Sequence, residues 1–132
     1  EAFALQANRQ ELACLIGRPE RWPSEEEIAA FAALAFETGV RAVFVTLGKD
    51  GDLVLTPGGS RTVRAPEAGI VVDTTGCGDV FCARAFQLIV RGTSVFEAAE
   101  AGVVLASSAV GRAGVRATFE MVRDSTAASE AP

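Results

Sequence analysis

The order of apolar patterns along the chain is the feature that most limits its fold. Short runs rich in β-branched and aromatic residues, such as Ala42 to Leu47, are typical of buried strands. Longer runs with apolar residues three and four positions apart, such as the run after Ser24, are typical of helices. In chain order the patterns give strand, helix, helix, strand, a β-meander and further helices. This order predicts an α/β fold with a mixed sheet.

Turn and capping residues predict where the elements begin and end. Ser24 with Glu27, and Ser94 with Glu97, have the spacing of capping boxes that open helices. Glycine and proline mark the intervening turns. The expected strands are at 3–7, 42–47, 53–55, 61–64 and 69–72, and the expected helices at 9–16, 24–39, 79–90 and 94–110, with a last short one from Thr118.

The length of 132 residues suits one domain, which we expect over residues 1–124. The small and polar segment 125–132 is expected to be a flexible tail. The sequence contains no histidine, which excludes Ser-His-Asp and Cys-His catalysis and His-ligated metal sites. Acid–base chemistry must therefore come from Asp, Glu, Lys or Cys.

Charge and cysteine usage narrow the class of protein further. The net charge of −5 and the pI of about 4.7 disfavour a nucleic-acid binder, which usually has a basic face. No apolar run reaches the roughly 18–20 residues of a membrane span, so no membrane partner is expected. The three cysteines show no Cys-x-x-Cys spacing, which indicates neither a disulfide framework nor a zinc site and favours a reducing cytoplasm.

A glycine-rich turn that leads into an apolar helix is the segment with the clearest chemistry. It runs Gly76-Cys77-Gly78-Asp79. Unpaired N–H groups and the positive end of the helix dipole make such a turn a binding site for anions. The two glycines would let a phosphate approach the backbone, because they have no Cβ. Asp79 would then lie in the first helical turn, beside the phosphate.

The same residues have a purely structural alternative, in which Asp79 caps the helix and the glycines form an ordinary turn. Two familiar phosphate-binding motifs do not fit. No Lys-Ser/Thr pair follows the glycines, as a Walker A loop would require. A dinucleotide-binding fingerprint would need glycine where the chain has Phe81.

The longer string Asp73-Thr-Thr-Gly-Cys-Gly-Asp79-Val-Phe resembles the signature of the ribokinase-like (PfkB) carbohydrate kinase family, with Cys77 where alanine is usual. Three further segments resemble family motifs and occur in the family's order: Asn8-Arg-Gln-Glu11, Thr46-Leu-Gly-Lys-Asp-Gly51, and the small segment from Ala109 to Gly114. The resemblance extends to about Arg116. It implies a ribokinase-like layered α/β/α fold, present as the C-terminal, nucleotide-binding portion of the Rossmann-like domain. The family's N-terminal half, which carries most sugar contacts and a β-sheet lid, has no counterpart in the chain.

The resemblance also implies the reaction and the roles of individual residues. The γ-phosphoryl group of ATP would pass to a hydroxyl of a sugar, with Asp79 as the catalytic base and the amides of Gly76, Cys77 and Gly78 as the anion hole. ATP, Mg²⁺ and a monovalent cation such as K⁺ are the implied cofactors. The implied nucleotide-binding residues are Asn8, Thr46, Gly48, Gly51, Val103, Ala106 and Gly114, and the implied metal-binding residues are Glu11 for Mg²⁺ and Asp73 and Thr75 for the monovalent cation.

Several alternatives stay open at this point. The acceptor could be a nucleoside or a vitamin precursor, or the chain could be a nucleotide-binding module without catalysis. Asn8 could simply be a helix N-cap, and the turn from Gly48 to Gly51 an ordinary hairpin turn. Cys77 is read as a small packing residue, although a thiol at a helix N-terminus can be reactive. We expect this chain alone to be inactive, and the full-length protein to form a homodimer.

Overall fold

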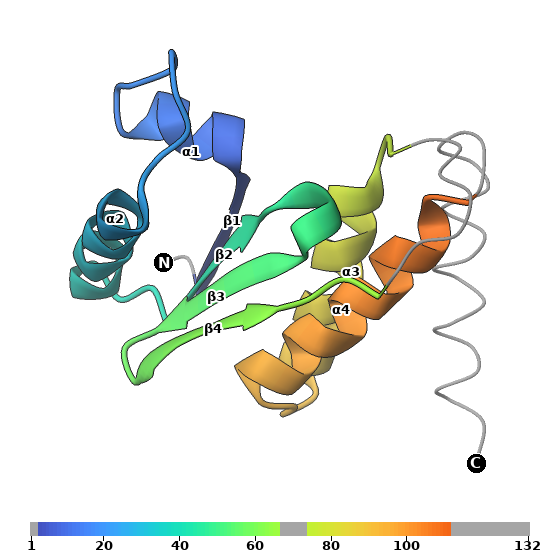
Figure 1. The fold of residues 1–132 in the computed structure, drawn as a ribbon. Helices are drawn as coiled ribbons and strands as arrows, with labels where there is room; N and C mark the ends of the chain where they lie inside the picture. Colours follow the sequence, from blue (N-terminus) through green and yellow to red (C-terminus); the bar gives the residue numbers. More distant parts are fainter. Residues whose placement is uncertain (1–2, 67–73, 112–132) are drawn as a thin grey trace. The chain divides into compact units, whose positions relative to one another are not determined.

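The computed structural model describes residues 3–66 and 74–111 (Figure 1). The chain divides into two compact units, the first ending at Val63 and the second beginning at Arg64. The predicted strand at 69–72 and the predicted helix from Thr118 lie outside the described residues, as does the segment 125–132. None of the described helices combines the length and the apolar character that crossing a membrane requires.

The first unit is built on a four-stranded mixed sheet with the strand order β1-β2-β3-β4 (Figure 1). Strands β1 and β2 are parallel, whereas the β2–β3 and β3–β4 pairs are antiparallel. The prediction of a mixed sheet is therefore confirmed. The strands are β1 (Ala4–Asn8), β2 (Ala42–Thr46), β3 (Asp52–Thr56) and β4 (Gly59–Val63).

Alternation along the strands decides which face of this sheet is covered by helices. Val43 and Val45 of β2 and Leu55 of β3 share one face and join the main apolar core. Helix α1 (Arg9–Leu15) contributes Leu12 to this core, and helix α2 (Glu25–Glu37) contributes Ile28, Ala32 and Ala35. The opposite face carries the alternate side chains, which are Gln6, Phe44, Thr46, Asp52 and Val54.

Local signals in the sequence set the ends of α2 as predicted. The Ser24 side chain accepts a hydrogen bond from the Glu27 N–H, and the Glu27 carboxylate accepts one from the Ser24 N–H at 2.9 Å. This reciprocal capping box satisfies two N–H groups that the helix itself cannot pair. The chain leaves the helix through Gly39, whose φ of 97° is in the left-handed region that favours glycine.

The second unit contains the helical hairpin of α3 (Cys77–Val90) and α4 (Val95–Ala109). The two helices pack closely, and Gly102 of α4 lies against the buried ring of Phe81 on α3. A Cβ at position 102 would come within 2.8 Å of the Phe81 ring, so only glycine fits without a shift. Helix α3 begins two residues earlier than the predicted start at Asp79.

Candidate active site

The first group of predicted site residues lies where β1 and β2 end. Asn8 is the last residue of β1 and Thr46 the last of β2, and the two are partners in the parallel register. Because parallel strands end at the same edge of a sheet, the turns that follow them start at that edge too. The structure therefore brings Asn8 and Glu11 of α1 to the same edge as Thr46 and the turn from Gly48 to Gly51.

Asn8 and Glu11 form a capping box at the start of α1. The Asn8 Oδ1 accepts a hydrogen bond from the Glu11 N–H at 2.8 Å, and the Glu11 Oε2 accepts one from the Asn8 N–H at 2.8 Å. The structural alternative for Asn8, a helix N-cap, is thus confirmed. Asn8 is exposed, so capping leaves its side chain at the surface of this edge.

The turn after β2 has a backbone that only glycine adopts easily. Residues Gly48–Asp50 form the short 3₁₀ helix η1, and Gly48 and Gly51 have φ values of 67° and 96°. The Leu47 N–H donates to the Gly51 carbonyl at 2.8 Å and closes the turn. Apart from Gly48 itself and its chain neighbours, no heavy atom lies within 4 Å of a Cβ built at Gly48, so its backbone is open to an approaching ligand.

Asp52 directly follows this turn and was not predicted as a site residue. It is only 4% exposed, and its Oδ1 has no hydrogen-bond partner. Burial raises the pKa of this carboxyl group to about 8. Asp52 pairs with Thr46 across the β2–β3 ladder, and the Thr46 hydroxyl accepts a hydrogen bond from Gln6 at 3.5 Å. An acidic residue at the first position of an otherwise apolar strand was the available signal in the sequence.

The second group of predicted site residues lies at the start of α3. Gly76 is the N-cap, with φ of 81° in the left-handed region, and no side chain caps the helix. The Val80 N–H makes the first helical hydrogen bond, to the Gly76 carbonyl at 3.0 Å. Gly78 and Asp79 occupy the first turn and are exposed.

These observations show that Asp79 does not cap α3. Asp79 is the third residue of α3, and the cap position belongs to Gly76. The Cys77 N–H already donates to the Thr74 carbonyl at 3.3 Å, and Cys77 itself is half-buried. We therefore expect an anion at this helix start to accept hydrogen bonds from the amides of Gly76, Gly78 and Asp79 rather than from that of Cys77.

The other predicted positions are placed as follows. Thr75 lies exposed in the turn before α3. On α4, Val103 is 3% exposed and Ala106 is half-buried. Asp73 and Gly114 lie outside the described residues. Among the residues that the structure describes, no three His, Cys, Asp or Glu side chains gather in a way that could hold a metal ion.

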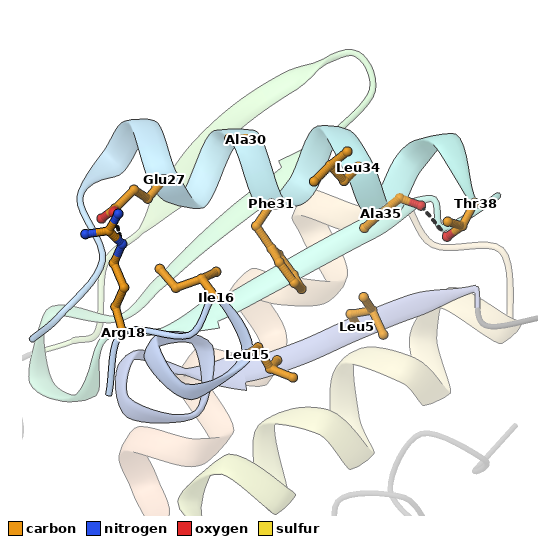
Figure 2. Close-up of a pocket in the computed structure, with 10 residues that line it drawn as sticks. All are labelled: Leu5, Leu15, Ile16, Arg18, Glu27, Ala30, Phe31, Leu34, Ala35 and Thr38. Atoms are coloured by element: carbon orange, nitrogen blue, oxygen red, sulfur yellow. Dashed lines mark hydrogen bonds and ion pairs between the residues drawn. The ribbon is translucent and has the colours of Figure 1, made fainter. Parts of the chain in front are cut away.

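An apolar groove of about 650 Å³ lies elsewhere in the first unit, between α1, α2 and β1 (Figure 2). Leu5, Phe31 and Leu34 give it an apolar lining, and the ion pair of Arg18 with Glu27 marks one end. None of the described residues predicted for the site lines this groove. The groove is therefore not the candidate active site.

Comparison with solved structures shows that the chain is similar to ribokinases and to a nucleoside kinase. A ribokinase from Arabidopsis thaliana, complexed with ribose and ATP, superimposes with a TM-score of 0.74 at 29% identity over 91% of this chain. A ribokinase from Thermotoga maritima superimposes with a TM-score of 0.75 at 27% identity over 92% of this chain. A nucleoside kinase from Burkholderia thailandensis, in complex with inosine, superimposes with a TM-score of 0.69 at 25% identity over 86% of this chain.

The chain spans only 40%, 41% and 34% of these three proteins, in the same order, so it corresponds to part of a ribokinase-like α/β fold. No curated protein matches the chain. The family model described as pfkB family carbohydrate kinase matches residues 1–121, nearly the whole sequence. This chain therefore belongs to the pfkB family of carbohydrate kinases.

Proposed function

We propose that this chain is the ATP-binding part of a longer kinase that phosphorylates a hydroxyl group of a sugar. The observation that carries the proposal is the start of α3, where a glycine in the left-handed region opens an uncapped helix and Asp79 stands exposed in the first turn. Such a helix start offers N–H groups and a positive dipole to a phosphate. An exposed carboxylate in that first turn is placed to serve as the base.

The proposed step balances as a phosphoryl transfer. The acceptor hydroxyl oxygen forms a bond to the γ-phosphorus of ATP, the bond from that phosphorus to the bridging oxygen breaks, and ADP leaves. The hydroxyl proton passes to the Asp79 carboxylate. Phosphoryl transfer needs positioning and stabilisation of charge more than a strong base. The amides of Gly76, Gly78 and Asp79 would supply that stabilisation.

Each unit contains residues that we propose for nucleotide binding. We propose Asn8, Thr46, Gly48 and Gly51 at one edge of the sheet in the first unit, where the open backbone of Gly48 can face phosphates and ribose, while Gly51 is buried. In the second unit, we propose that Val103 and Ala106 of α4, together with Gly114, contribute to nucleotide binding. The Arabidopsis ribokinase was solved with ATP, which supports ATP as the phosphoryl donor.

Carboxylate and hydroxyl oxygens among the predicted residues suit hard cations. The Glu11 carboxylate has one oxygen engaged by the Asn8 N–H, which leaves the other for a further ligand. We therefore propose that Glu11 holds Mg²⁺ through water, since Mg²⁺ keeps much of its hydration shell. When bound, Mg²⁺ would neutralise charge on the phosphates. Asp73 and Thr75 are proposed to hold a monovalent cation such as K⁺.

A nucleoside is the second candidate for the acceptor. The nucleoside kinase solved with inosine has nearly the same similarity to this chain as the ribokinases. Residues for phosphate chemistry are shared by both classes of enzyme, so they do not separate the two acceptors. For the whole protein we propose a cytoplasmic homodimer. For this chain alone we propose no phosphorylation of an acceptor, because the acceptor must be held in line with the γ-phosphate.

An acceptor screen of the full-length protein tests the proposal. ATP and Mg²⁺ would be incubated with a panel of pentoses, hexoses and nucleosides, and ADP release would be measured. We expect ADP release that depends on one class of acceptor. Release with a nucleoside but with no sugar would select the second candidate, and acceptor-independent background throughout would contradict a kinase.

A further inference from the structure

Arg9, the first residue of α1, bridges two segments at the edge where the candidate nucleotide residues lie. Its Nη2 is 3.8 Å from Oδ2 of Asp50 in η1, directly before Gly51. Its Cζ also lies 4.7 Å from the centre of the Trp22 ring, in the segment between α1 and α2. One guanidinium group therefore contacts both the turn after β2 and the segment after α1.

The segment that carries Trp22 is anchored by hydrogen bonds to the carbonyls of Pro19 and Trp22. The Gln10 side chain donates to the Pro19 carbonyl at 3.0 Å. Arg21 donates to the Trp22 carbonyl at 3.1 Å and to the Glu27 carboxylate at 2.7 Å. Trp22 is nevertheless 62% exposed, which leaves its surroundings open to solvent. Contact with a cation on the ring face is favourable even at exposed sites.

The carboxylate that Arg9 contacts has an unusual position for an acidic group. Asp50 lies between Gly48 and Gly51, and the open backbone of Gly48 is proposed to receive the phosphates of the nucleotide. The negative charge of Asp50 would repel the phosphates of a nucleotide bound at this turn. Salt screens charges incompletely when they are closer than about 8–10 Å. A cation held beside Asp50 would remove most of that repulsion.

We propose that Arg9 is a positioning residue of the nucleotide site, which neutralises Asp50 and ties the turn from Gly48 to Gly51 to α1 while Trp22 supports it. This proposal rests on the proposed function, since it concerns a nucleotide bound at that turn. Arg9 acts on the ligand through Asp50 rather than by touching the phosphates. In this proposal Trp22 orients the guanidinium group of Arg9, and the fluorescence of the Trp22 ring responds to the contact.

A double-mutant cycle on the 132-residue chain tests this assignment. ADP binding would be measured by calorimetry for wild type, Arg9→Gln, Asp50→Asn and the double variant. We expect Arg9→Gln to weaken binding about three- to tenfold at low salt and less at high salt. When Asp50→Asn is already present, the same change should alter affinity by less than about twofold. Arg41→Gln is the matched control, because Arg41 is exposed and precedes the opposite end of β2.

Fluorescence gives a second readout that needs no nucleotide. Trp22 is the only tryptophan and the chain has no tyrosine, so emission reports on this ring alone. Emission of the free protein should change in Arg9→Gln and stay unchanged in Arg41→Gln. Unaltered emission, or equal weakening of ADP binding with and without Asp50→Asn, would overturn the proposal. If wild type binds no ADP while Trp22 emission still depends on Arg9, the contact between Arg9 and Trp22 exists but the proposed ATP-binding function is wrong. The proposed role of Arg9 in nucleotide binding is then wrong as well.

Discussion

At the scale of the residue, Asp52 is the least expected feature of the first unit. A carboxyl group that is 4% exposed and has an oxygen without a partner is costly in its charged form. Its pKa is therefore raised from 3.8 to about 8, and the folded state holds the proton more tightly than the unfolded chain does. The position next to the turn from Gly48 to Gly51 makes this proton relevant to the proposed nucleotide site.

Because the pKa of Asp52 differs between the folded and the unfolded state, the free energy of unfolding depends on pH. Between about pH 4 and pH 8 the unfolded chain has lost this proton while the folded chain keeps it, so the free energy of unfolding falls as pH rises. The full slope for one proton is about 1.4 kcal/mol per pH unit. Asp52→Asn should remove this contribution and be more stable than wild type at pH 9. Urea unfolding at pH 5, 7 and 9 measures the free energy of unfolding, and Glu26→Gln, at an exposed position, is the control. If the free energy of unfolding depended on pH in the same way in wild type and in Asp52→Asn, the prediction would be wrong.

At the scale of the element, the hairpin of α3 and α4 depends on close contact at Gly102. A Cβ there would lie 2.8 Å from the Phe81 ring and 3.1 Å from the Phe81 carbonyl oxygen. Alanine normally favours a helix over glycine by about 1 kcal/mol. Overpacking of a buried contact costs about 1–3 kcal/mol, and the backbone oxygen can yield only if the helices separate.

We therefore expect Gly102→Ala to destabilise the second unit despite its better helix propensity. The melting temperature of the chain, followed by circular dichroism in the far ultraviolet, should fall relative to wild type. Ser108→Ala, at an exposed position of the same helix, should leave it nearly unchanged. A higher melting temperature for Gly102→Ala would mean that the helices are free to adjust their spacing.

The start of α3 carries a second prediction at this scale. Crystals soaked with sulfate or a non-hydrolysable ATP analogue should show an anion against the amides of the turn from Gly76 to Asp79. Gly78→Val should abolish this binding, because a β-branched side chain would intrude on the approach. Val104→Ala, on an exposed face of α4, is the control. An anion bound consistently elsewhere, with this turn empty, would leave the turn a purely structural feature.

At the scale of the whole molecule, the sequence predicted the features that depend on local signals. The capping box of Ser24 with Glu27 and the short apolar run of β2 were enough to locate α2 and a buried strand. The start of α3 was predicted two residues too late, at Asp79, because Cys77 and Gly78 have poor helix propensity. The left-handed Gly76 is the N-cap, and the helix begins at Cys77. The burial of Asp52 and the contacts of Arg9 depend on strand register and on distant segments, which no local pattern specifies.

The central claim, that Asp79 is the base of a phosphoryl transfer, is tested most directly by the kinetics of Asp79→Asn in the full-length protein. The variant keeps the size of the side chain and removes its ability to take a proton. Turnover should fall by about 10²–10⁴-fold, while the dissociation constant for ATP, measured by calorimetry, stays within about threefold of wild type. Turnover close to that of wild type would contradict the account, because the start of α3 would then bind phosphate without taking part in the proton transfer.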